Sequence, residues 1–164
     1  MIRKATTADI PAIRDMASVA FPSTYREILS PGQLEYMMDM MYSEASLKRQ
    51  MTEAGHDFYI CDGRGYVSFR REGRLDDGTE LFHLEKLYVL PQEQGSGLGR
   101  RLFGTVVDEI RKRSAGKFRI ELNVNRYNSA VTFYENLGMT KSRQGDFPIG
   151  NGYFMNDYIM AIDF

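Results

Sequence analysis

Residues Tyr88 to Leu102 read YVLPQEQGSGLGRRL, and they constrain the fold more than any other stretch of this chain. An apolar run meets a proline, passes through glycines at 95, 97 and 99, and continues into two arginines. Glycines spaced in this way let a backbone approach a ligand closely. Apolar residues then recur at helical spacing over 98–113, and a helix N-terminus favours an anion. The stretch predicts a strand, an anion-binding loop and a helix.

Two well-known phosphate loops are excluded by the residues that they require. A Walker loop ends in Gly-Lys-Ser/Thr, and GLGRR lacks the lysine and the hydroxyl. A dinucleotide fingerprint needs Gly-x-Gly-x-x-Gly, but its third glycine position is Arg100 counted from Gly95 and Leu102 counted from Gly97. A solvated turn without a ligand is the remaining alternative, which the glycines alone do not exclude.

The sequence before this stretch predicts a short opening strand, three helices and two strands. The helices are expected at 7–21 after a threonine cap, at 31–41 after the cap Ser30, and at 43–54. Strands are expected at 57–62 and 66–71 around a hairpin turn. The methionines at 37, 38, 40 and 41 could line an adaptable pocket, but core packing is the favoured interpretation.

The sequence from 81 onward alternates strands and helices. Strands are expected at 81–90, 117–124 and 139–143, with a short helix at 129–138 and a last strand after the Asn151-Gly152 turn. The fold class is α/β (α+β), with helices flanking a sheet, in one domain spanning 1–164.

Composition limits the partners. A net charge of −1 argues against a nucleic-acid or membrane binder, although basic residues cluster locally at 100–101 and 111–113. The single cysteine, Cys61, lies in an apolar run and is interpreted as a buried structural thiol. No histidine or second cysteine lies at metal-ligand spacing, and no stretch is long and apolar enough to span a membrane. We expect a cytoplasmic protein without a metal.

Two motifs together resemble the GNAT acyltransferases. LYVLPQEQGSGLGRRL is similar to the family's acetyl-CoA signature Gln/Arg-x-x-Gly-x-Gly/Ala, with Gln94, Gly97 and Gly99 at the fixed positions. NSAVTFYENLGM resembles the second signature, in which an Asn and a small residue precede Phe-Tyr on a short helix. Only Ser129 separates Asn128 from Ala130, where the family commonly has two residues. The resemblance implies a mixed, mainly antiparallel sheet whose central strands, 81–90 and 117–124, splay apart.

The resemblance also implies where acetyl-CoA binds. Its pyrophosphate is assigned to the loop from Gly95 to Arg100, and its pantetheine arm to backbone groups of Leu87 and Val89. The amide of Val89 would face the developing oxyanion. The full set of expected cofactor-binding residues is Leu87, Tyr88, Val89, Gln94, Gly95, Ser96, Gly97, Leu98, Gly99, Arg100 and Asn128.

The catalytic candidates are Tyr134, Glu85 and His83. By period-two alternation His83 and Glu85 share a face of their strand with Leu87 and Val89, and either could remove a proton from the acceptor amine. The alternatives are that Glu85 pairs with an arginine and that His83 lies toward the wet end of the strand. The family commonly uses a tyrosine at the position of Tyr134 as general acid; the alternative is a core tyrosine.

The expected reaction is acetyl transfer from acetyl-CoA to a primary amine. A polyamine is the first candidate acceptor, because residues 21–38 and the ending resemble the bacterial branch with polyamine acetyltransferases. A protein N-terminus or lysine, and an amino acid or antibiotic amine, are the alternatives. A catalytically silent acyl-CoA sensor is the rival of another class. The acceptor pocket is expected to draw on 21–42 and on the turn at 146–153, and a homodimer is left open.

Overall fold

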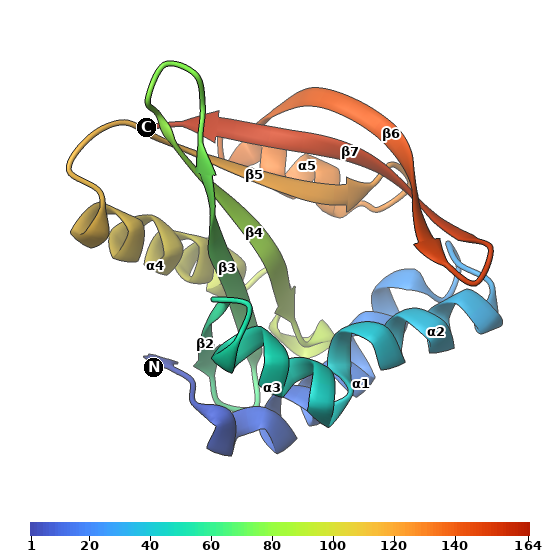
Figure 1. Cartoon of the computed structure of the whole chain (residues 1–164). Helices are drawn as coiled ribbons and strands as arrows, with labels where there is room; N and C mark the ends of the chain where they lie inside the picture. Colours follow the sequence, from blue (N-terminus) through green and yellow to red (C-terminus); the bar gives the residue numbers. More distant parts are fainter. The chain divides into compact units, whose positions relative to one another are not determined.

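A computed structural model describes residues 1–164 (Figure 1). It contains five α-helices and seven β-strands. The helices are α1 (Ile10–Tyr25), α2 (Pro31–Tyr42), α3 (Glu44–Thr52), α4 (Leu98–Arg113) and α5 (Ala130–Asn136). The strands are β1 (Ile2–Lys4), β2 (Asp57–Cys61), β3 (Gly65–Arg74), β4 (Glu80–Val89), β5 (Phe118–Asn125), β6 (Thr140–Gly150) and β7 (Tyr153–Asp163).

The strands hydrogen-bond in the order β1-β2-β3-β4-β5-β7-β6. β1 with β2, β2 with β3, β5 with β7 and β6 with β7 are antiparallel, whereas β4 and β5 are parallel. The parallel register joins Glu80–Leu84 to Phe118–Leu122 and ends there, although both strands continue. The predicted mixed, mainly antiparallel sheet with splayed central strands is confirmed.

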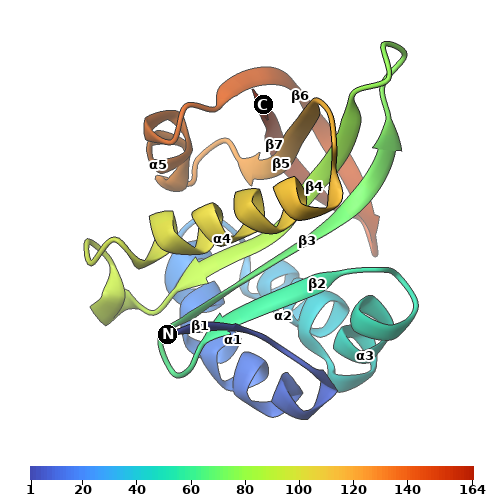
Figure 2. The same cartoon turned by 90° about the vertical axis from the view of Figure 1, so that its left-hand side faces the viewer.

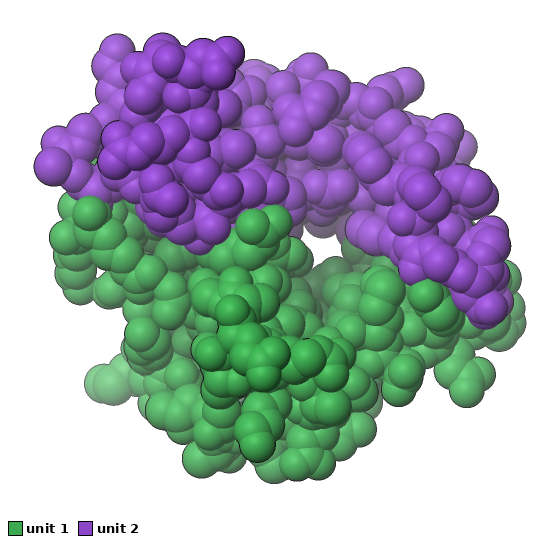
Figure 3. All heavy atoms as spheres, viewed as in Figure 1, with its two compact units in different colours: residues 1–70, 85–113 green, residues 71–84, 114–164 purple.

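The chain divides into two compact units (Figure 3). Unit 1 comprises residues 1–70 and 85–113, and unit 2 comprises residues 71–84 and 114–164. Strands β3 and β4 each contribute to both units.

In unit 1, helices lie on both faces of β2 and β3 (Figure 2). Tyr42, the last residue of α2, contacts the ring of Tyr66 on one face, and Arg113 of α4 lies over the ring of Phe69 on the other. α4 buries Leu98, Leu102, Phe103, Val106, Val107 and Ile110, the face that the helical spacing predicts. The core of this unit is therefore apolar on both sides of its strands.

The expected starts of α2 and α3 are confirmed by their caps, whereas α1 begins at Ile10, later than expected, because Thr6 caps a 3-10 turn over Thr7–Asp9. Ser30 Oγ accepts from the N–H of Gln33 at 3.1 Å, and Pro31 occupies the first helical position of α2. Ser43 caps α3 in the same way. The methionine prediction is wrong in part, since Met37 is buried but Met40 is 37% exposed. α2 turns only one narrow stripe to the core, and consecutive methionines cannot all lie on it.

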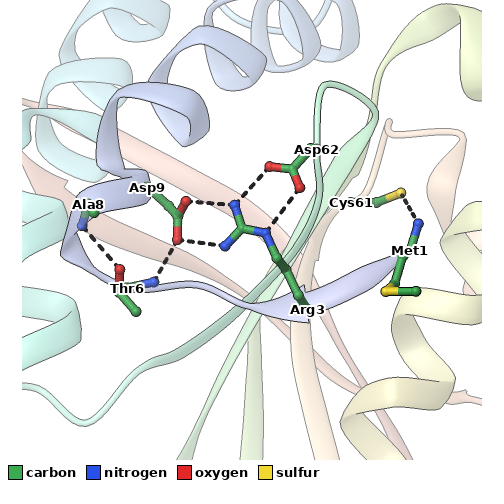
Figure 4. A network of polar contacts seen from close by, with 7 residues as sticks. All are labelled: Met1, Arg3, Thr6, Ala8, Asp9, Cys61 and Asp62. Carbon is green, nitrogen blue, oxygen red and sulfur yellow. Dashed lines mark hydrogen bonds and ion pairs between the residues drawn. The ribbon is translucent and has the colours of Figure 1, made fainter.

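Strand β1 is fixed by one guanidinium group (Figure 4). Arg3 donates to Asp9, at 2.7 Å from Nη2, and to Asp62, at 2.8 Å from Nη2 and 3.0 Å from Nε. These hydrogen bonds lower the pKa of both carboxyl groups. Cys61 is buried, as predicted for a structural thiol, and its Sγ lies 3.8 Å from the N-terminal ammonium group of Met1.

Unit 2 contains the paired strands β5, β7 and β6, with α5 against β5. Asn151 and Gly152 have φ values of 57° and 77°, which confirms the Asn-Gly turn. β6 is longer than predicted and runs to Gly150, with register shifts between Lys141 and Arg143 and, at the proline, between Pro148 and Gly150. No helix of the chain is long and apolar enough to cross a membrane.

Candidate functional site

The loop after β4 is tied to the hairpin between β2 and β3. The N–H of Leu90 donates to the carbonyl of Arg64 at 2.9 Å. The Arg64 side chain donates in turn to Glu93 Oε2 at 2.7 Å and lowers the pKa of that carboxyl group. Pro91–Glu93 form one 3-10 turn. These contacts fix the start of the loop before its glycines begin.

Gly95 and Gly97 both have a backbone that side chains rarely adopt, with φ of 83° and 84°. Ser96 between them turns its hydroxyl inward, donating to the carbonyl of Glu93 at 2.6 Å and accepting from the N–H of Leu98. The N–H groups of Gly95, Gly97 and Gly99 make no hydrogen bond within the protein. Nothing lies within 4 Å of the position of a Cβ at Gly95 or Gly97.

This loop begins α4, with the N–H of Arg101 donating to the carbonyl of Gly97 at 3.1 Å. Leu98 is fully buried, and Gly97 and Arg100 are exposed on either side of it. Unpaired N–H groups at the exposed positive end of a sixteen-residue helix can bind an anion without a metal. The residues present thus fit a pyrophosphate.

The close packing of the glycine loop on β3 depends on Gly65. A Cβ at Gly65 would lie 2.8 Å from the carbonyl oxygen of Tyr88, 3.1 Å from Val89 Cγ1 and 3.3 Å from Leu98 Cδ2. Only glycine therefore lets the end of β4 and the start of α4 pack this closely on β3. Val89 is thereby placed on the face of β3 to which Gly65 belongs.

Glu85 and Lys86 are adjacent in β4, yet both side chains lie on the face of β3 opposite to that of Gly65. Arg70, two residues beyond Ser68 in β3, donates from Nε to Glu85 Oε1 at 2.6 Å. Lys86 Nζ lies 5.5 Å from the ring centroid of Phe58, and Phe58 pairs directly with Ser68. The alternation of β4 is interrupted at this pair of residues.

The prediction that Glu85 shares a face with Leu87 and Val89 is therefore wrong. Strand periodicity holds only while the pleat is regular, and an irregular pair reverses every later side chain. The side chain of Tyr88 lies on the same face as that of Lys86, because the ring centroid of Tyr88 is 5.7 Å from that of Tyr66. The side chains of Leu87 and Val89 point away from Glu85, and the pairing of β4 with β5 has ended before them, at Leu84.

Of the two titratable candidates in β4, Glu85 has the arginine partner that the structural alternative foresaw. Its carboxylate forms an ion pair with Arg70, and the two side chains are 22% and 31% exposed. His83, in unit 2, has Nδ1 3.9 Å from Glu72 Oε2. Both residues retain some exposure, so neither is a sealed core group.

Lys86 is a buried residue that the sequence reasoning missed. Its ammonium donates to Gln50 Oε1 at 2.7 Å and lies 5.5 Å from the ring centroid of Tyr42. Burial lowers the pKa of Lys86 to about 8, against a smaller opposing effect of Glu85. A lysine next to Glu85 in the mainly apolar run LEKLYVL was the available signal.

In unit 2, Asn128 and Tyr134 lie at the start of and within α5. Asn128 Oδ1 accepts from the N–H of Ala130 at 2.9 Å, so this side chain caps the helix. Tyr134 is 8% exposed and makes an edge contact with Phe133, with ring centroids 5.3 Å apart. The structure is therefore compatible with both interpretations of Tyr134, a core tyrosine and a general acid at the motif position.

Comparison with known proteins identifies the family. The sequence profile of the acetyltransferase (GNAT) domain matches residues 25–152, which include the glycine loop, α4 and α5. The chain belongs to the GNAT acetyltransferase family. No group of three or more His, Cys, Asp or Glu side chains in it is positioned to hold a metal ion.

Individual members of the GNAT family are similar to this chain. The L-methionine sulfoximine/L-methionine sulfone acetyltransferase of Salmonella typhimurium is 35% identical over 81 residues, 49% of this chain and 46% of that protein. The chain thus matches about half the length of this relative. The PaiA N-acetyltransferase of Thermoplasma acidophilum, solved with coenzyme A, has a TM-score of 0.72 at 19% identity and covers 100% of this chain and 98% of that one. The yncA protein of Salmonella typhimurium, solved with acetyl-CoA, has a TM-score of 0.61 at 23% identity and covers 99% and 92%.

Proposed function

We propose that this GNAT protein transfers the acetyl group of acetyl-CoA to a primary amine. The observation that carries the proposal is the loop Gln94–Arg100, in which N–H groups without a partner within the protein surround the exposed start of α4. Membership of the family and two similar structures, solved with coenzyme A and with acetyl-CoA, support the same donor.

In this proposal the pyrophosphate of acetyl-CoA binds the N–H groups of Gly95, Gly97 and Gly99, with Arg100 adding its charge. The pantetheine arm extends along the backbone of Leu87 to Val89, where the pairing of β4 with β5 has ended. The N–H of Val89 then polarises the thioester carbonyl and stabilises the oxyanion. Asn128, whose side chain accepts from the N–H of Ala130 at the start of α5, stays a candidate to contact the cofactor.

The chemistry needs a neutral amine and a protonated leaving group. An alkylammonium group with a pKa of ~10 must lose a proton before it attacks the thioester carbon. Glu85 is the first candidate base, directly or through water, and His83 is the second. The C–S bond breaks as the tetrahedral intermediate collapses, and Tyr134 is the candidate acid that protonates the coenzyme A sulfur. The role of Tyr134 is assigned from the family motif, whereas Glu85 and His83 are candidates because of their place in β4, since the family has no fixed general base.

For the acceptor, a small primary amine is proposed. The Salmonella typhimurium relative is named for the acetylation of two amino acid derivatives, which favours an α-amine as the acceptor. Spermidine represents the polyamine class, and an alanine-initiated peptide represents a protein N-terminus. Residues 21–42 and 146–153 stay the candidate specificity segments, and exchanging them for those of another GNAT protein is expected to change the preferred amine.

The deciding experiment is thiol release from acetyl-CoA across a panel of L-methionine sulfone, spermidine, lysine and the peptide, with product masses. We expect one amine class to be acetylated at least tenfold faster than the hydrolysis of acetyl-CoA. Tight acetyl-CoA binding without turnover of any amine would favour the rival, an acyl-CoA sensor. Sedimentation of the same sample tests the homodimer.

A further inference from the structure

Two buried carboxylates lie on the same face of the strands in unit 2, and they differ in their partners. Glu121, 5% exposed, lies 3.1 Å from Arg119 Nε and 3.1 Å from Arg143 Nη2. Asp157, 2% exposed, has no ion pair at all. Burying a carboxylate without a cation costs free energy of folding, so a protein that retains one is expected to use it.

The contacts of Asp157 leave one oxygen unused. Asn123 Nδ2 donates to Asp157 Oδ2 at 3.2 Å, and Oδ1 accepts no hydrogen bond within the protein. Oδ1 is not a sealed, unpartnered atom, so it retains contact with solvent. The nearby cation, Arg126, is directed elsewhere: its side chain donates to the carbonyl of Gly145 and to Asp146 Oδ1. Burial raises the pKa of Asp157 against the smaller effects of Asn123 and Arg126.

An aromatic ring lies beside this carboxylate. Asp157 of β7 pairs directly with Gly145 of β6, and the ring of Phe147 covers the glycine, with Cζ 2.9 Å from where a Cβ would be. Gly145 and Phe147 are two residues apart in a regular stretch of β6 and so share the face of Asp157. Phe147 is only half-buried. A carboxylate next to a partly exposed ring suits an ammonium group.

The location fits the transfer reaction. Asn123 directly follows Leu122, the last residue of β5 that pairs with β4, so the Asn123–Asp157 pair lies where the parallel strands stop pairing. We propose that Asp157, held by Asn123 and flanked by the ring of Phe147, binds the ammonium form of the acceptor nitrogen before the base removes its proton. This inference rests on the proposed function and assigns the recognition of the acceptor's ammonium group to one residue.

The test is steady-state kinetics of Asp157→Asn with whichever amine of the panel the parent acetylates fastest. Asn is isosteric but uncharged, so the KM for the amine is expected to rise about 10–100-fold, the value of a hydrogen bond to a charged group. The KM for acetyl-CoA is expected to change less than about twofold. Phe147→Leu is expected to raise the KM for the amine by about threefold, because only the ring contact is lost.

The matched control is Asp163→Asn, the same change in the same strand at an exposed carboxylate. An amine KM that stays at the parent's value in Asp157→Asn, or rises equally in the control, overturns the inference while leaving the proposed function intact. If Asp157→Asn does not fold, Asp157→Ser is measured with the same criteria. A parent that acetylates no amine of the panel overturns both.

Discussion

Arg70 Nε lies 2.6 Å from Glu85 Oε1, so the first candidate for the general base of this GNAT protein is held in an ion pair within its own unit. The same contact places Glu85 on the face of β3 opposite to that of Gly65 and Val89. It therefore defines two separable roles for the carboxylate, proton acceptor or partner of an arginine.

Comparing Glu85→Gln with Arg70→Gln separates these roles. If Glu85 acts as base, Glu85→Gln is expected to lower kcat about 10²–10⁴-fold, with little change in acetyl-CoA affinity and a changed rising limb of the pH–rate profile. Arg70→Gln keeps the carboxylate and is expected to cost much less. Equal, small losses in the two variants would make Glu85 a structural partner and His83 or water the next candidate.

Gly97→Ala tests the pyrophosphate loop. At the φ of 84° of Gly97, any side chain costs about 1–2 kcal/mol of backbone strain. The effect of this strain on affinity has to be separated from the loss of phosphate contacts, so the test needs a control variant with equal strain. Gly63→Ala provides it, because Gly63 has φ of 69° in the hairpin turn and equally open surroundings. We expect similar melting temperatures for the two variants, with acetyl-CoA affinity lowered at least about tenfold only in Gly97→Ala, as calorimetry can measure. Equal affinities would place the pyrophosphate elsewhere.

Tyr134→Phe tests the general acid. The change removes only the hydroxyl group and keeps the buried ring against Phe133. A coenzyme A thiol has a pKa near ~8.5 and leaves moderately well unaided, so kcat is expected to fall by at most about 10²–10⁴-fold. The exposed Tyr127, changed to Phe, is the control. A lower melting temperature with kcat retained would instead identify Tyr134 as a core residue that donates to a buried partner.

Lys86 predicts a pH dependence of stability. Because its pKa falls from 10.5 unfolded to about 8 folded, the unfolded chain binds more protons between these values, and the contribution of Lys86 to stability rises with pH by about 3 kcal/mol. Lys86→Met removes this dependence. Denaturant unfolding of both proteins is measured at pH 7 and pH 10. The free energy of unfolding of the parent is expected to rise relative to that of Lys86→Met as the pH rises. A pH-independent difference would mean that water reaches the ammonium group.

Local features of this fold were predictable because they depend on neighbouring residues alone. Ser30 caps α2, Asn151-Gly152 forms a turn and 98–113 is a helix, as the sequence indicates, since capping, left-handed turns and helical spacing act over a few residues. The glycine loop was recognisable for the same reason. Gly95 and Gly97 adopt positive φ values, which glycine permits without a steric cost.

The partners of the titratable groups were decided by the tertiary structure. Arg70 and Glu85 are fifteen positions apart, and Lys86 meets Gln50 thirty-six positions away. The interruption of the pleat at Glu85–Lys86 reversed the faces that strict alternation assigns, and no local pattern signals it. Asp157 stands in an ordinary strand sequence, and only the pairing of β7 with β5 and β6 buries it next to Asn123 and Gly145 without a cation. Burial and pairing across strands are properties of the assembled sheet, because each residue's surroundings come from distant parts of the chain.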